Sequence, residues 1–197
     1  MHFVPGYSMM AATATTFMLS MIFLLLSGQS KKQYMRFWGI AWLVYSAMFL
    51  LDFCHLNWNF VYLGYVMLRQ MLALLGSYTF LLGTHHFSQI KCPAVLGFAA
   101  IISTISMVLY PASYPVYTLM IIPNIIFSSG LLIYSGCMFI AISWTQKLPE
   151  KLIASFLIIL WSIFINHFAF SLKNQQLEIV SYYISIFTVN VLILTLI

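Results

Sequence analysis

Two charged side chains of opposite sign stand within apolar stretches of this sequence. Asp52 comes near the end of one apolar run, and Arg69 lies about nine residues into the next. The segment LNWN between the two runs predicts a tight turn, so the runs would be antiparallel neighbours. Arg69 would then lie roughly 13 Å deep in a helix, and its long side chain can reach back toward the helix end. The spacing therefore allows an Asp52–Arg69 ion pair.

Three interpretations of these two charges are open from the sequence. The pair can simply hold two helices together. Arg69 can instead face a water-filled pocket and receive an anionic or carbonyl-bearing ligand, or it can stand unpaired in a water-filled cavity. An ionised side chain inside a membrane needs either a partner or water around it, and each interpretation supplies one of these.

Other polar and aromatic residues fall at a similar depth. Several recur at helical spacing and would share a face with one of the two charges, while an asparagine after a proline lies beside a freed backbone carbonyl. Together they predict an outward-facing cavity with aromatic walls, as small-ligand sites usually have. The alternative is that they form interfacial belts and helix contacts. The candidate ligand-binding residues are Trp42, Tyr45, Asp52, Tyr65, Arg69, Asn124, Trp161, Asn166 and His167.

Histidine and cysteine residues show no metal-binding pattern. His85 and His86 are adjacent, and adjacent residues point about 100° apart on a helix, so we interpret them as a solvated pair at the inner end of a span. Cys54, Cys92 and Cys137 form no CxxC motif. The sequence therefore predicts neither a metal site nor a cofactor.

Catalytic motifs are missing as well. The chain has only three Asp and Glu residues, and only Asp52 is expected at membrane depth, so a paired-carboxylate protease or pump is not expected. It contains no HExxH, GxSxG or P-loop motif. We therefore do not expect an enzyme.

The elements that must position these residues are long apolar runs. Of 197 residues, 63% are hydrophobic and 6% are charged, against about 25% charged in soluble domains. Runs of about 20 apolar residues can cross a bilayer as helices. We predict an all-α polytopic bundle in the cell membrane, a single domain over residues 1–197 with about seven transmembrane helices. The expected spans are residues 8–27, 37–55, 60–84, 94–110, 116–143, 152–172 and 179–197.

Basic residues are divided unequally between the two sets of loops. Lys173 is the only one in the second, fourth and sixth loops. Short cytoplasmic loops are enriched in Lys and Arg, so we expect the N-terminus outside and the C-terminus in the cytoplasm. This scattered distribution also argues against a nucleic-acid partner. The first, third and fifth loops hold Lys31, Lys32, Arg36, Lys91, Lys147 and Lys151.

Two stretches resemble a known class of protein. KKQYMRFWGIAWLVYSAMFLLD contains Tyr34, Met35, Arg36, Trp38 and Trp42, and LLGSYTFLLGTHHF contains Gly76, Gly83 and Phe87. They are similar to the first cytoplasmic loop, second span and end of the third span in the N-terminal multi-span sensor regions of bacterial histidine kinases and GGDEF diguanylate cyclases. The resemblance covers under a third of the chain. It implies a sensor followed by an output domain, and it assigns no ligand.

We therefore expect a membrane-embedded sensory or receptor module. It would lie in the lipid bilayer as a homodimer, bind a small molecule in an outward-facing cavity and signal to a cytoplasmic output domain. The last residues, VNVLILTLI, are still apolar, as in a chain that continues into a signalling helix. A small-molecule carrier or the substrate-binding subunit of a transporter is the alternative, and an assembly subunit of a larger complex is a third possibility.

Overall fold

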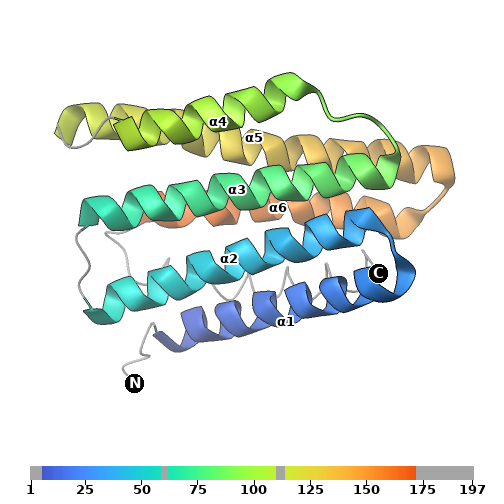
Figure 1. The fold of residues 1–197 in the computed structure, drawn as a ribbon, viewed down its shortest axis with the longest axis horizontal. Coiled ribbons are helices and arrows are strands. Elements are labelled where there is room, and N and C mark those ends of the chain that lie inside the picture. Colours follow the sequence, from blue (N-terminus) through green and yellow to red (C-terminus); the bar gives the residue numbers. More distant parts are fainter. Residues whose placement is uncertain (1–5, 59–61, 110–113, 172–197) are drawn as a thin grey trace.

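The structure is a computed structural model that describes residues 6–58, 62–109 and 114–171. The expected seventh span, 179–197, lies outside the described residues. Within the described ranges all regular secondary structure is helical, which confirms the all-α class. The helices pack side by side into an elongated bundle (Figure 1).

Each of the first six expected spans corresponds to one helix. Four helices, α1, α2, α3 and α5, contain described segments that are long and apolar enough to cross a membrane. In α4 the described apolar segment is shorter, Ala94–Ser106. The helices are α1 Gly6–Ser30, α2 Gln33–Trp58, α3 Tyr62–Ser88, α4 Ala94–Leu109, α5 Tyr114–Gln146 and α6 Pro149–Ser171.

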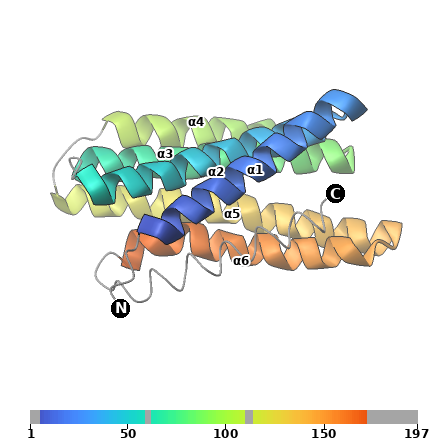
Figure 2. The same ribbon diagram turned by 90° about the horizontal axis from the view of Figure 1, so that it is seen from below.

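The third helix is the centre of the bundle. It contacts α2, α4, α5 and α6, whereas α1 packs against α2. Figures 1 and 2 show α1 to α4 following one another in one layer, with α5 and α6 in a second layer behind them. A polar residue on α3 can therefore reach several other helices.

The ends of α1, α3 and α5 share a backbone conformation. Lys31, Gln89 and Lys147 follow these helices with φ of 55°, 60° and 55°, the left-handed conformation that closes many helices. The Ile90 N–H donates to the His85 carbonyl at 3.2 Å, as in a Schellman motif. The three loops lie at the same end of the bundle in Figure 1, so their basic residues do too. This end is called the basic end below.

An aromatic core joins α2 to α3 and α5. The Trp38 ring lies 6.0 Å from Phe80, 5.6 Å from Phe87 and 5.8 Å from Phe139. Gly83 leaves room for it, because a Cβ at this position would overlap the indole of Trp38. Gly76 does the same for Tyr45, whose Cε1 would lie 2.7 Å from an added Cβ. In this structure, several residues that carry the sensor resemblance are therefore contacts between α2 and α3, namely Trp38, Gly76, Gly83 and Phe87.

Candidate functional site: an ion-paired cluster on three helices

The expected ion pair is present near the end of the bundle opposite the basic end. The Arg69 Nε donates to Asp52 Oδ1 at 3.0 Å and to Oδ2 at 3.3 Å. The side chains are 2% and 0% exposed, respectively. Two charges withdrawn from water this far need close mutual contact and further hydrogen bonds. The prediction of an Asp52–Arg69 pair is therefore confirmed.

The same arginine reaches a third helix. Its Nη2 donates to the backbone carbonyl of Ile165 on α6 at 3.1 Å. The guanidinium group presents its N–H donors in different directions, so one side chain joins α2, α3 and α6. Sequence reasoning missed this contact, because a carbonyl 96 positions away has no side-chain signal.

Tyr65 and His55 complete the charged group. The Tyr65 hydroxyl donates to Asp52 Oδ1 at 2.8 Å, and the ring of His55 stacks on the Tyr65 ring at 3.8 Å with 4° between the planes. His55 was not predicted, although it follows Asp52 at i+3 on α2. Asp52, His55, Tyr65, Arg69 and the Ile165 carbonyl are called the Arg69 cluster below.

The predicted aromatic residues form a layer next to this cluster, toward the basic end. Trp161 of α6 lies 5.5 Å from the Trp42 ring and 5.7 Å from the Tyr45 ring. The Tyr45 hydroxyl is 3.1 Å from Ser77 Oγ. The layer is buried from solvent, so Trp42, Tyr45 and Trp161 are brought together as expected.

Asn124 of α5 contacts the backbone of α3. Its Nδ2 donates to the Gln70 carbonyl at 3.4 Å. Gln70 is fully buried, and neither its side-chain amide nor Asn124 Oδ1 has a hydrogen-bond partner among the described residues. Gln70 was not among the residues predicted from the sequence, because an uncharged amide beside Arg69 is a weaker signal than the charge of Arg69 itself. Asn166 and His167 follow Ile165 in α6, but their side chains lie outside the described residues.

The hollows with described linings are elsewhere. They lie around the α3–α4 loop, between α4 and α5, beside the α1–α2 loop, and between α3 and α4. No candidate residue lines any of these four, so ligand binding at the Arg69 cluster stays a prediction. In the part of the chain that is described, no group of three His, Cys, Asp or Glu side chains is placed to hold a metal ion.

Comparisons with protein-family models, curated proteins and solved structures find no match to this chain. The resemblance to bacterial sensor regions therefore rests on the residues of α2 and α3 alone. The structure adds a helical bundle with four helices able to cross a membrane, in which one ion-paired cluster joins three helices.

Proposed function

We propose that this protein is a membrane-embedded sensory module in which a small ligand with an anionic or carbonyl oxygen acts on the Arg69 cluster. One observation carries the proposal: Arg69 divides its donors between the Asp52 carboxylate and the neutral Ile165 carbonyl. The Arg69 guanidinium is a cation, so Coulomb attraction makes an anionic oxygen a stronger partner for it than a neutral carbonyl. A ligand oxygen with negative charge would therefore compete well with the Ile165 carbonyl for Nη2.

Such competition would release one contact between α3 and α6. A hydrogen bond to a charged group contributes about 1.5–3 kcal/mol, and about 1.4 kcal/mol changes an equilibrium tenfold. The loss of one such contact is thus enough to shift a two-state packing equilibrium. The α5–α6 contact from Ser129 Oγ to the Ser162 carbonyl, at 3.2 Å, would keep α6 attached while it moves.

In this proposal the bundle lies across the cell membrane with the Arg69 cluster in its outer half. The basic end faces the cytoplasm, and α4, α6 and residues 179–197 bring the number of spans to seven. The position of all three basic loops at one end of the bundle supports this orientation (Figure 1). A homodimer would pass the movement of the last helices to a cytoplasmic output domain, without catalysis by the membrane domain.

Thermal unfolding of the purified chain with small carboxylates and their amide analogues tests the proposal. A carboxylate at 100 times its Kd should stabilise the protein by about 2.7 kcal/mol. The Arg69→Gln variant should lose this response, whereas Lys91→Gln, which removes a cation from the basic end, should keep it. A stabilisation that persists in Arg69→Gln would remove Arg69 from the binding site.

Sealed vesicles that contain only this chain separate a sensor from a carrier. The carboxylate that stabilises the protein should stay outside such vesicles. Its accumulation inside them, dependent on the protein, would make the chain a carrier and sink the sensory proposal.

A further inference from the structure

Two hollows adjoin at the basic end of the bundle, on the side of α4. The first, of about 530 Å³, lies around the α3–α4 loop, and its lining includes the polar residues His85, Gln89 and Lys91. The second, of about 750 Å³, lies between α4 and α5 and is lined almost entirely by apolar residues, among them Leu96 and Phe127. We call them the head hollow and the chain groove.

Residues that line the two hollows are neighbours at two places. Cys92 of the head hollow is followed directly by Pro93 of the chain groove. The His85 ring also lies 5.8 Å from the ring of Tyr134, which lines the chain groove. A hollow that contains several polar side chains, next to an almost wholly apolar groove, suits a molecule with a polar head and a hydrocarbon chain.

The chemistry of the head is set by His85, which is only 2% exposed. Its Nδ1 lies 3.1 Å from the Ile90 carbonyl. A carbonyl can only accept, so Nδ1 carries the proton and Nε2 of the neutral ring is an acceptor. Nε2 has no hydrogen-bond partner among the described residues. A buried acceptor without a hydrogen-bond partner lowers the stability of the folded protein. A ligand O–H or N–H would supply the missing hydrogen bond.

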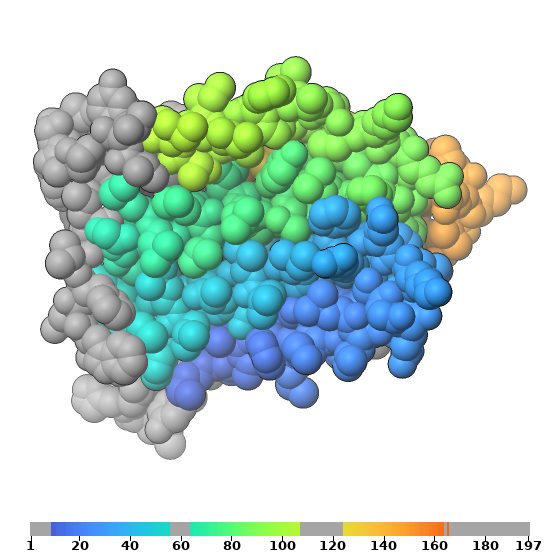
Figure 3. Space-filling model, in the orientation of Figure 1, coloured from blue at the N-terminus to red at the C-terminus, as the bar shows by residue number. Residues whose placement is uncertain are grey.

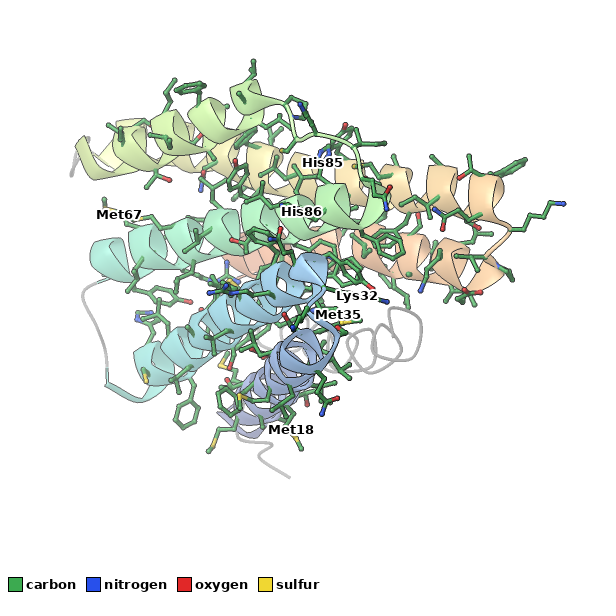
Figure 4. All side chains as sticks on the ribbon, turned by 45° about the vertical axis from the view of Figure 1, so that its right-hand side comes forward. Met18, Lys32, Met35, Met67, His85 and His86 are labelled. Atoms are coloured by element: carbon green, nitrogen blue, oxygen red, sulfur yellow. The ribbon has the colours of Figure 1, made fainter. Side chains whose placement is uncertain are left out.

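The adjacent His86 differs from His85. Its ring stacks on Phe37 of α2 at 4.9 Å, and Figure 4 shows it on the α2 side of α3, with His85 toward α4 and α5. His86 is exposed at the rim of the head hollow.

The charge of the site is positive. Lys91 is exposed in the lining of the head hollow, and neither lining contains Asp or Glu. The hollow therefore favours an anionic group beside a hydroxyl donor. Phospholipid headgroups with a phosphate and free hydroxyls offer this combination, whereas phosphatidylcholine has no O–H or N–H donor for Nε2.

The chain groove lies where a lipid can enter it from the bilayer. The stretch of α5 from Ile126 to Tyr134 is about 12 Å long, and both residues line the groove. The outer face of α4 is apolar, with Phe98 65% and Ile102 66% exposed. In the space-filling view, α4 runs along the edge of the face formed by α1 to α4 (Figure 3).

We propose that the head hollow and the chain groove together bind one anionic phospholipid with a hydroxylated headgroup, of the phosphatidylglycerol type. The phosphate pairs with Lys91, a headgroup hydroxyl donates to His85 Nε2, and one acyl chain lies in the groove between α4 and α5. Anionic lipids concentrate at basic membrane faces, and the site belongs to the basic end. It is separate from the Arg69 cluster and does not depend on the function proposed above.

Native mass spectrometry of the full chain in detergent tests the site with four probes. These are dioleoylphosphatidylglycerol, dioleoylphosphatidylmethanol, dioleoylphosphatidylcholine and soluble glycerol phosphate. Phosphatidylglycerol should bind most tightly.

Phosphatidylmethanol has the same charge without the hydroxyls, and it should bind several-fold more weakly. Equal binding of these two would overturn the role of His85, and equal binding of phosphatidylcholine would overturn the anionic site. If glycerol phosphate displaces the lipid at equal concentration, the hollow binds a soluble phosphate ester instead.

Variants test the two parts of the site separately. Lys91→Gln should weaken phosphatidylglycerol binding about fivefold. Lys147→Gln removes another exposed cation of the basic end that lines neither hollow, and it should leave binding unchanged. Gly130→Leu places a side chain in the chain groove, and nothing lies within 4 Å of a Cβ added at Gly130. This change should weaken binding at least roughly tenfold. Gly64→Leu, also in open space but at the far end of α3, is the matched control. Unchanged binding in Gly130→Leu would exclude the groove as the chain site.

Discussion

Arg69 makes directed contacts with two acceptors of different strength. It faces a carboxylate on α2 at 3.0 Å and a neutral carbonyl on α6 at 3.1 Å. The carboxylate is in turn held by the Tyr65 hydroxyl. The Arg69 cluster is thus a network in which the loss of one member leaves buried polar groups behind, a costly state in a low-dielectric interior.

A double-mutant cycle measures the coupling within the ion pair. Asp52→Asn and Arg69→Gln should each lower the free energy of unfolding by about 3–5 kcal/mol, because each leaves one buried charge without its counter-ion. The double variant should lose less than the sum of the two single losses, by about 1–3 kcal/mol. Denaturation in detergent micelles gives the values. Losses that simply add would mean that the two charges do not stabilise each other.

The Cys92 thiol provides a pH-dependent test of the α3–α4 loop. Burial raises the pKa of this thiol, and only the thiolate reacts with a maleimide. At neutral pH a smaller fraction of Cys92 is ionised than of an exposed cysteine. The alkylation rate of Cys92 should therefore still rise with pH in the range where the rate of the exposed cysteine no longer changes. A Lys147→Cys variant with the native cysteines replaced supplies the exposed reference. Coinciding pH profiles would show that Cys92 is exposed in solution.

Single site residues could be predicted from the sequence where an ionisable residue lies within an otherwise apolar stretch. Asp52 and Arg69 are such residues, and the pair follows from the tight turn between their helices. The Ile165 carbonyl and the unpartnered His85 Nε2 were not predictable. A backbone acceptor leaves no mark in the sequence, and the state of a ring nitrogen depends on its tertiary neighbours.

The contacts between helices follow from small residues facing large aromatic ones. Gly83 of α3 lies against Trp38 of α2, and Gly76 lies against Tyr45. Membrane helices associate through close van der Waals packing, which such pairs allow. The sequence indicated the two glycines through a family resemblance, but it did not indicate their aromatic partners. Those depend on how α2 and α3 are rotated about their axes.

Two alanine substitutions distinguish close packing from helix propensity. Gly83→Ala should destabilise the bundle by about 1–3 kcal/mol, because the new methyl group meets the fully buried Trp38. Gly130→Ala on α5, with nothing within 4 Å of its added Cβ, should stabilise it by about 0.5–1 kcal/mol. Thermal unfolding of both variants tests the packing. Equal effects of the same sign would contradict the contact between Gly83 and Trp38.

Across the whole molecule, hydropathy predicted the helices better than their packing. The first six expected spans match helices to within a few residues, because apolar length fixes a membrane helix. The division into layers was not predictable, because nearly every helix carries apolar residues all round and no single face is marked. The central place of α3 and the grooves beside α4 come from side-chain fit alone.

Cysteine labelling tests the proposed orientation. In a chain without its native cysteines, Lys147→Cys at the basic end should react with an impermeant maleimide only after the cells are permeabilised. Gly64→Cys, at the opposite end, should react in intact cells, because cytoplasmic loops carry the basic residues. Both positions are exposed. Labelling of both from outside, or of Lys147→Cys alone, would refute the orientation.

If Arg69 holds α6 against α2 and α3, its loss should move α6, and a distance measured between two spin labels can detect this movement. Labels at Leu50 of α2 and Ile163 of α6 would lie on exposed positions near the Arg69 cluster. In Arg69→Gln the mean distance between these labels should change by about 1–2 Å, or the distance distribution should broaden. A second pair, Leu75 of α3 and Ile126 of α5, should stay unchanged and so report an intact bundle. An unchanged Leu50–Ile163 distance in Arg69→Gln would show that α6 is held in place without the arginine.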